Sequence, residues 1–364
     1  MLKMDKMILK INRALDFYHK NGLAEFIRSK FIDRAFQKYH ETKIYWSPRR
    51  LYVPLSRINI DRPVFLLGLQ GGGGTLFSRM IKRNNNVVTI TGNNDFWAGS
   101  DEMHNYHRFK ALPDSWVLRG PGYNNMTGRE TDHPIFGLGR GGVYGVDSLV
   151  SEYRKTEKDW SPALDSAIKD KIKQCIRANS HDIDKARFID MSQTYALKIP
   201  LLKKCFPDAK FVLMLRNPYA ICWRLATKNP ERKYMLWNRV PDQYEAVKLA
   251  AEHYANNMSI ALRDIKKHGG MIIRYEDVIE KPEATLKKVL YFIDLDFSFE
   301  LLPQPGQKMP WGSKDKKKWY PIKKEINTKY LSEIPDWACV IIKDRCGGII
   351  EEFDYDKELQ QVKR

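Results

Sequence analysis

The sequence predicts an α/β fold of three layers, in which helices cover both faces of a central parallel sheet. A short apolar run at residues 64–67 leads through four consecutive glycines into a helical pattern. From residue 186 to residue 293, strand and helix patterns alternate regularly, which favours parallel strands joined by crossover helices. The chain has 364 residues and 43% hydrophobic content, which is enough to bury a sizeable core.

The N-terminal segment carries apolar residues at helical spacing among many lysines and arginines. This pattern predicts two amphipathic helices between residues 3 and 39, with a hinge near Asn21 and Gly22. Such helices either pack on their own domain or dock to an anionic membrane surface. The sequence leaves both readings open.

The pattern of apolar residues and glycines over residues 63–83 predicts a buried strand, a glycine loop and a helix. Glycines let the backbone turn sharply and present its N–H groups to an anion at the positive end of the following helix. A glycine run can also be only a flexible connection, but the strand and helix on either side favour an anion site. The loop lacks the Gly-Lys-Ser/Thr ending of nucleotide triphosphatases and the spacing of dinucleotide folds.

After a second short strand at residues 87–90, the chain as far as Ser151 is rich in glycine, aromatic residues and histidine. Long irregular segments inside compact proteins are usually functional loops, and the aromatic residues predict an ordered loop that lines a substrate cleft. A helix then follows at residues 162–179, with Ser161 as its cap and Pro162 in its first turn.

The alternating part of the chain gives further elements from its hydrophobic periodicity. The predicted strands are 187–191, 210–216 and 271–274, and the predicted helices are 195–206, 218–227, 242–268 and 282–293. We expect residues 1–61 to form the N-terminal basic helices, 62–300 the α/β domain with an irregular insertion at about 91–158, and 301–364 a basic loop and helix that complete the same domain.

Composition narrows the partners and the compartment. There are 62 Lys+Arg against 44 Asp+Glu, a net charge of +18, so the surface should attract anions. The five cysteines are odd in number and form no Cys-x-x-Cys pair, which argues against a disulfide framework or a zinc site and predicts a cytoplasmic protein. Without an apolar run of membrane-spanning length or a signal-peptide core, we expect it to be soluble.

A second anion signal lies at the end of the strand at 210–216. Arg216 ends this strand, Asn217-Pro218 opens the next helix, and Arg224 follows eight residues after Arg216. The carboxyl ends of parallel strands share one rim, so Arg216 should lie beside the glycine loop. Guanidinium groups suit phosphate, although Arg216 taken alone could instead pair with a surface carboxylate.

Four segments in this order resemble the sulfotransferases that use 3′-phosphoadenosine 5′-phosphosulfate (PAPS). Residues 68–75 are similar to the family's Gly-x-Pro-(Arg/Lys)-Ser-Gly-Thr-Thr loop, and 216–218 to its Arg-(Asp/Asn)-Pro segment, with Arg224 in the place of a serine. Residues 206–211 resemble the lead-in to the second segment, and 274–283 a later strand and helix. The resemblance extends over about residues 63–296.

The resemblance implies a P-loop-NTPase-like sulfotransferase architecture that transfers a sulfuryl group from PAPS to a hydroxyl or amine, without a metal. The aromatic loop from Phe96 to Trp116 and the basic surface suit a carbohydrate as acceptor, and the same residues could enclose a small molecule. The implied cofactor-binding residues are Gln70, Gly71, Gly72, Gly73, Gly74, Thr75 and Leu76 for the 5′-phosphosulfate, and Arg216 and Arg224 for the 3′-phosphate. The implied candidates for the general base, just beyond the second strand, are Asp95, Glu102 and His104, with His107 as a further one.

Two departures from the family pattern concern charge. Gly71 stands where relatives have a cation that contacts the transferring group, and Met191 stands where many have a lysine. Fixed cations near developing negative charge are a major catalytic factor, so other groups must supply the charge or the rate is low. Candidates for that charge are Lys198, Arg79 and the lysines at 314–318.

Three alternatives follow from the residues. The missing cations keep open a catalytically impaired relative that binds a nucleotide or a glycan. A P-loop kinase is disfavoured because no Gly-Lys-Ser/Thr ending and no evident magnesium aspartate are present. A nucleic-acid-binding protein is suggested by charge alone, without a recognisable module.

Overall fold

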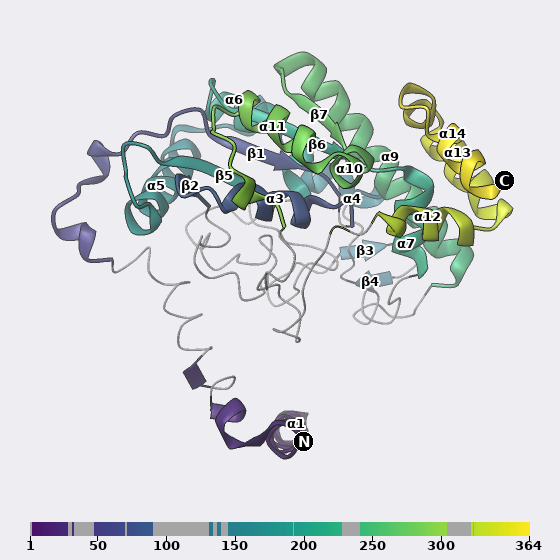
Figure 1. Ribbon diagram of the computed structural model, residues 1–364, viewed down its shortest axis with the longest axis horizontal. Coiled ribbons are helices and arrows are strands. Elements are labelled where there is room, and N and C mark those ends of the chain that lie inside the picture. Colours follow the sequence, from purple (N-terminus) through teal and green to yellow (C-terminus); the bar gives the residue numbers. More distant parts are fainter. Residues whose placement is uncertain are drawn as a thin grey trace.

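The computed structural model describes residues 2–27, 31–32, 47–69, 71–89, 131–133, 137–139, 145–191, 193–227, 241–303, 322 and 324–364. Within these ranges, a five-stranded sheet has the order β2-β5-β1-β6-β7, and every neighbouring pair is parallel. Its strands are β1 Val64–Leu67, β2 Val87–Val88, β5 Arg187–Met191, β6 Lys210–Leu215 and β7 Met271–Arg274. The sheet spans the middle of the body, with helices on either side of it (Figure 1). The predicted three-layer α/β fold is therefore confirmed.

The helices precede these strands, connect them or follow them. Those of three turns or more are α1 Leu2–Ile27, α5 Pro162–Asn179, α9 Gln243–His268, α11 Pro282–Phe292 and α13 Asp336–Glu352. The shorter ones are α3 Gly74–Lys82, α4 Asp147–Tyr153, α6 Ile199–Cys205, α7 Pro218–Thr227, α10 Tyr275–Glu280, α12 Glu325–Glu333 and α14 Tyr355–Lys363. Single 3-10 turns lie at Pro48–Leu51, Leu55–Arg57, Glu157–Asp159, Gln193–Leu197 and Phe299–Leu301, and a small antiparallel hairpin joins β3 Thr131–His133 to β4 Gly137–Gly139.

Alternate residues of the strands feed two separate hydrophobic cores, because neighbouring side chains of a strand point to opposite faces of the sheet. Phe65 and Leu67 pack with residues of α5, α6, α7, α9 and α13 on one face. Val64 and Leu66 pack with α3, α10 and α11 on the other. Every residue of β1 is buried, as the short apolar run predicts for a central strand.

Local signals place the main helices where the sequence predicts them. The Ser161 hydroxyl accepts a hydrogen bond from the Leu164 N–H at 3.2 Å and caps α5. Asp242 and Glu245 form a capping box at the start of α9, and Gly269, with a φ of 80°, ends that helix. The strands at 187–191 and 271–274 are confirmed with their predicted bounds, and β6 ends one residue before Arg216.

The prediction of one helix over residues 195–206 is wrong in part. The chain forms a 3-10 turn at Gln193–Leu197, leaves helical geometry at Lys198, and begins α6 at Ile199. Pro200 lies in the first turn of α6, where its missing N–H costs nothing, whereas a continuous helix would need that donor.

The C-terminal part contains more helix than predicted. Three helices, α12 to α14, follow residue 324, and α13 buries Ala338, Ile342, Cys346 and Ile349 at helical spacing. These helices lie together at one end of the body, beside α7 and α9 (Figure 1). The basic run at 314–318 lies outside the described residues.

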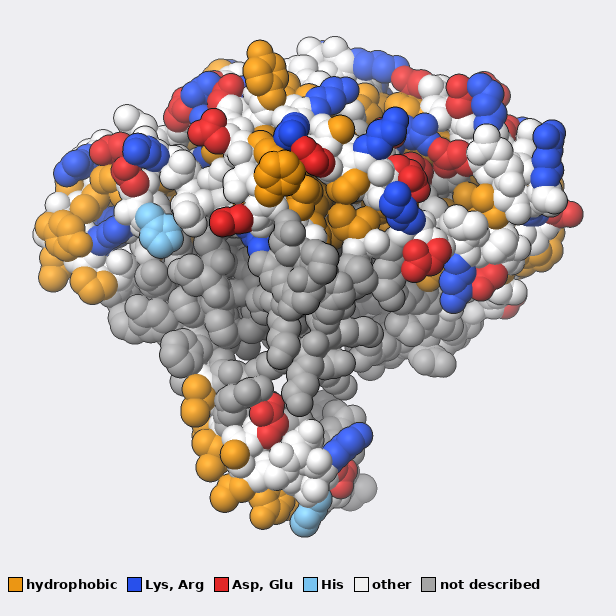
Figure 2. Space-filling view, viewed as in Figure 1, with side chains coloured by type: hydrophobic (Ala, Val, Ile, Leu, Met, Phe, Trp, Pro, Cys, Tyr) orange, Lys and Arg blue, Asp and Glu red, His pale blue; other side chains and the backbone are white. Residues whose placement is uncertain are grey.

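The N-terminal helix α1 confirms the predicted hinge. Gly22 has φ 79° and ψ 170° and interrupts the helical geometry. Ile11, Leu15 and Leu23 are 50%, 49% and 60% exposed. Hydrophobic side chains line one edge of this projecting segment (Figure 2).

Candidate functional site

The glycine loop connects β1 to α3 at the carboxyl end of the sheet. Gly73 is the N-cap of α3, and the first N–H groups of a helix have no acceptor within it. The Gly72 N–H, which the sequence assigned to the anion, instead donates to the Leu69 carbonyl at 2.9 Å and closes the turn. The backbone donors that the α3 terminus can offer to an anion therefore begin at Gly73.

At three glycines of the loop, a neighbouring side chain occupies the place where a Cβ atom would lie. A Cβ atom at Gly73, whose φ is 92°, would overlap the ring of Tyr275. At Gly74 a Cβ atom would lie 2.8 Å from the Met191 sulfur, and at Gly71 it would overlap the Arg224 guanidinium. Side chains from α10, β5 and α7 thus lie against the loop, and the rigid Tyr275 ring makes Gly73 the position where a Cβ atom fits least well.

Leu76, predicted to contact the cofactor, points its side chain into the core beside α3, where it is 7% exposed. Only the backbone N–H of Leu76 can then donate to an anion. The backbone of Thr75 lies in the first turn of α3. Gln70 and the three candidate bases, Asp95, Glu102 and His104, lie outside the described residues.

Arg216 lies directly beside the glycine loop, as the strand order predicts. Its Nη1 donates to the Gly71 carbonyl at 2.5 Å, and its Nε donates to Asn327 Oδ1 at 2.8 Å. The guanidinium carbon is 4.4 Å from the centre of the Tyr275 ring. Its exposed fraction is 3%, and its buried Nη2 has no hydrogen-bond partner among the residues that the structure describes.

The electrostatics of Arg216 favour an anion beside it. The pKa of Arg216 is lowered to about 10, mainly by burial and also by the nearby charge of Arg224, while Tyr275 and Glu276 act in the opposite direction. Its hydrogen-bond partners are a carbonyl and an amide, and neither carries a charge. A buried cation with an unused donor gains most from an anionic ligand.

The segment after Arg216 is held by acidic residues distant in the sequence. The Asn217 N–H donates to Glu276 Oε1 at 3.0 Å, and its side-chain amide donates to Glu358 Oε2 at 2.9 Å. Asn217 Oδ1 accepts from the Tyr219 N–H at 3.0 Å, so this side chain also caps α7. Glu358 pairs with Arg274 as well.

Asn327 and Glu358, which position the site, were missed by sequence reasoning. Asn327 joins Arg216 to Glu276, whose Oε1 accepts from the Asn327 amide at 2.5 Å. The contact of Asn327 with Arg216 spans 111 positions and that of Glu358 with Asn217 spans 141, and no local pattern signals them.

Lys198 is a poor replacement for the missing loop cation. It is fully buried, and burial, followed by the charge of Lys155, lowers its pKa to about 7. A lysine with that pKa is only partly charged at neutral pH. The lysines at 314–318 lie outside the described residues, and the side chain of Arg79 is not described.

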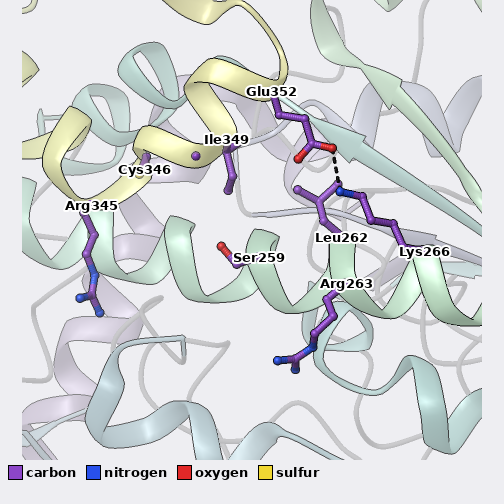
Figure 3. Close-up of a pocket in the computed structure, with 9 residues that line it drawn as sticks. Ser259, Leu262, Arg263, Lys266, Arg345, Cys346, Ile349 and Glu352 are labelled. Carbon is purple, nitrogen blue, oxygen red and sulfur yellow. Dashed lines mark ion pairs between the residues drawn. The ribbon is translucent and has the colours of Figure 1, made fainter.

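A separate hollow of about 440 Å³ lies between α9 and α13 (Figure 3). Lys266 and Glu352 pair across it at 2.9 Å, while Arg263 and Arg345 extend to the same side of it. Its lining includes neither a glycine-loop residue nor Arg216. We therefore place the candidate site at the loop, where the buried cation lies.

A glycine loop at a helix N-terminus, with an arginine directly after the neighbouring strand of the sheet, is the arrangement typical of anion-binding sites in α/β proteins. A model of the sulfotransferase family matches residues 63–299, which is more than half of the chain. The protein therefore belongs to the sulfotransferase family. The match spans the glycine loop, Arg216 and every strand of the parallel sheet in the described ranges.

Individual relatives are distant. A protein of Caenorhabditis briggsae, named as a candidate protein-tyrosine sulfotransferase, is 29% identical over 111 residues, which are 29% of this chain and 36% of that protein. This chain thus matches only about a third of that relative's length.

The solved structures that match are also distant in sequence. The sulfotransferase domain from the curacin biosynthetic pathway shares 15% identity at a TM-score of 0.49, covering 82% of this chain and 99% of that domain. Mouse sulfotransferase SULT7A1 complexed with PAP shares 11% identity at a TM-score of 0.41, covering 84% and 91%.

Proposed function

We propose that the protein transfers a sulfuryl group from PAPS to a hydroxyl or amine of an acceptor, a carbohydrate or small molecule. The observation that carries this proposal is Arg216, a buried guanidinium with an unused donor that lies against the glycine loop. A donor with phosphate at both ends of its ribose needs two such anion sites close together. The loop and Arg216 offer them on one rim of the sheet.

In the proposed reaction an acceptor oxygen or nitrogen attacks the sulfur in line. A bond from that atom to sulfur forms, the bond from sulfur to the 5′-phosphate oxygen breaks, and the acceptor's proton passes to a general base. The α3 N-terminus would hold the phosphate that leaves, and Arg216 would hold the 3′-phosphate. Asp95, Glu102 and His104 remain our candidates for the base.

Binding of the cofactor tests the proposal first. Thermal stability should rise with 3′,5′-bisphosphoadenosine, by about 2.7 kcal/mol at a hundred times its dissociation constant, and should not rise with ATP or a DNA duplex. Stabilisation by ATP and not by the bisphosphate would point to a kinase instead. Transfer of labelled sulfate to a library of glycans and small alcohols then tests the chemistry.

A catalytically impaired relative is the second candidate, and Met191 favours it. Its sulfur packs against Gly74, where an apolar thioether offers no charge to the transferring group. Binding of the bisphosphate without transfer to any acceptor of the library would support this candidate.

The exposed apolar side chains of α1 concern a possible membrane partner. Among the described residues, no helix is both long and apolar enough to cross a membrane. Contact of the exposed apolar face of α1 with an anionic membrane, and a cytoplasmic location, stay predictions. Co-sedimentation with anionic vesicles, and its absence with neutral ones, tests the membrane contact.

A further inference from the structure

Arg224 lies where the side chain of a loop cation would begin. A Cβ atom at Gly71 would overlap its Nη1 and lie 3.2 Å from its Cζ. Gly71 also has a φ of 82°, a conformation that L-residues rarely adopt. The guanidinium therefore fills the space that a side chain at position 71 would need, and the two residues form one arrangement: glycine on the loop and arginine above it.

The helix that carries Arg224 is firmly held. The Asn217 side chain caps α7, and the carbonyl of Arg216, just before it, accepts from the Tyr254 hydroxyl at 2.9 Å. The neighbours Trp223 and Leu225 are buried in the core, whereas Arg224 is partly exposed. The guanidinium thus reaches the loop from a rigid element, as a preorganised cation should.

Arg224 and Arg216 are close enough for the charge of one to lower the pKa of the other. They differ in their surroundings, however. Arg216 donates to the Gly71 carbonyl from a buried position, while Arg224 lies on the side-chain face of the same glycine. Each cation can therefore serve a different group of one ligand.

We propose that Arg224 supplies the charge that Gly71 lacks, by contacting the 5′-phosphosulfate end of the donor and not the 3′-phosphate. This inference rests on the proposed function. It changes the sequence-based expectation, which placed Arg224 with Arg216 at the 3′-phosphate. It also fits the glycine: at a φ of 82° position 71 disfavours any side chain, and Arg224 occupies the space that one would enter.

Nucleotides that carry one of the two groups separate these assignments. Titration calorimetry would compare adenosine 5′-phosphosulfate with adenosine 3′-monophosphate on wild type and Arg224→Gln. Loss of a charge-assisted contact should weaken the 5′-phosphosulfate about tenfold or more and leave the 3′-monophosphate within about twofold. Arg345→Gln, a partly exposed arginine of α13, is the matched control and should change neither.

Other results would overturn the inference. These are a loss confined to the 3′-monophosphate, an equal loss for both nucleotides, or no loss for either. Arg224→Gln should keep the thermal midpoint of wild type, because its side chain is not part of the core. Failure of the wild-type protein to bind 3′,5′-bisphosphoadenosine would instead remove the proposed function, and this inference with it.

Discussion

The ring of Tyr275 contacts both Arg216 and Gly73: the guanidinium carbon is 4.4 Å from the ring centre, and the ring leaves no room for a Cβ atom at the glycine. One aromatic side chain thereby joins the two halves of the site. A cation over an aromatic ring is stabilised electrostatically, and more strongly when it is desolvated, as Arg216 is.

Replacing Arg216 with alanine should weaken binding of 3′,5′-bisphosphoadenosine by more than about 1 kcal/mol, because a charge-assisted contact is lost. Calorimetric titration measures this. Arg263→Ala, an exposed arginine of α9, should bind as wild type does. An unchanged affinity in Arg216→Ala would show that the site lies elsewhere.

Gly73→Ala should lower the free energy of unfolding by about 1 kcal/mol or more, since it combines a positive φ with overlap on Tyr275. Urea denaturation is the measurement. The matched control is Gly347→Ala in α13, where nothing lies within 4 Å of the added Cβ and helix propensity predicts a gain of about 0.5–1 kcal/mol. Equal effects at the two positions would contradict the steric account of the loop.

Glu358→Gln should destabilise the fold by about 1–2 kcal/mol and weaken bisphosphate binding, because Arg274 and Asn217 both lose a charged acceptor. Denaturation and titration report the two effects. Glu352→Gln breaks only an exposed pair with Lys266 and should cost less than about 1 kcal/mol, without a change in affinity. If Glu358→Gln left binding intact, α14 would not position the site.

His253 should make the fold sensitive to acid. Burial lowers the pKa of His253 to about 3, and its Nδ1 accepts from the Gly145 N–H at 2.9 Å. As pH falls below the unfolded pKa of about 6.5, the unfolded state takes up a proton that the folded state does not bind until about pH 3. Stability that is fully present above pH 6.5 is therefore lost between these values.

This loss has a slope of up to about 1.4 kcal/mol per pH unit. Urea denaturation from pH 7 to pH 4 measures the free energy of unfolding against pH. The part of the slope that comes from His253 should be missing in His253→Gln. The exposed His181→Gln should keep it. The same slope in wild type and His253→Gln would rule this residue out as its source.

Replacing the general base should lower turnover without weakening the binding of the nucleotide. Among Asp95→Asn, Glu102→Gln and His104→Gln, one should lower kcat by about 100-fold or more. Its affinity for 3′,5′-bisphosphoadenosine should stay that of wild type. Normal turnover in all three would move the base to another residue.

The sequence was sufficient where structure depends on local patterns. Apolar runs predict the buried strands, and the capping residues Ser161 and Asp242 mark helix starts that the structure confirms. Arg216 beside the loop follows from a topological rule about the carboxyl ends of parallel strands. None of these inferences needs contacts between distant residues.

The parts of the fold and of the site that could not be predicted depend on contacts between residues distant in the sequence. That Arg224 lies against Gly71 could not be inferred, because the sequence gives the spacing along α7 but not the direction of its side chains across the loop. The roles of Asn327 and Glu358 are set by the packing of α12 and α14 on the body. The C-terminal helices were underestimated because α13 carries tandem glycines at 347 and 348, which reduce helix propensity.

The long reach of the C-terminal contacts has a consequence for folding kinetics. Asn327 and Arg216 are 111 residues apart, and Glu358 and Asn217 are 141 residues apart. Closing such large loops costs entropy before any contact stabilises them, so these contacts should form late during refolding, as should the similarly distant pairing of Val64 with Lys210 in the sheet. The helices, which depend on local contacts, can form while Arg216 still lacks its partners, and nucleotide binding should then recover more slowly than helical structure.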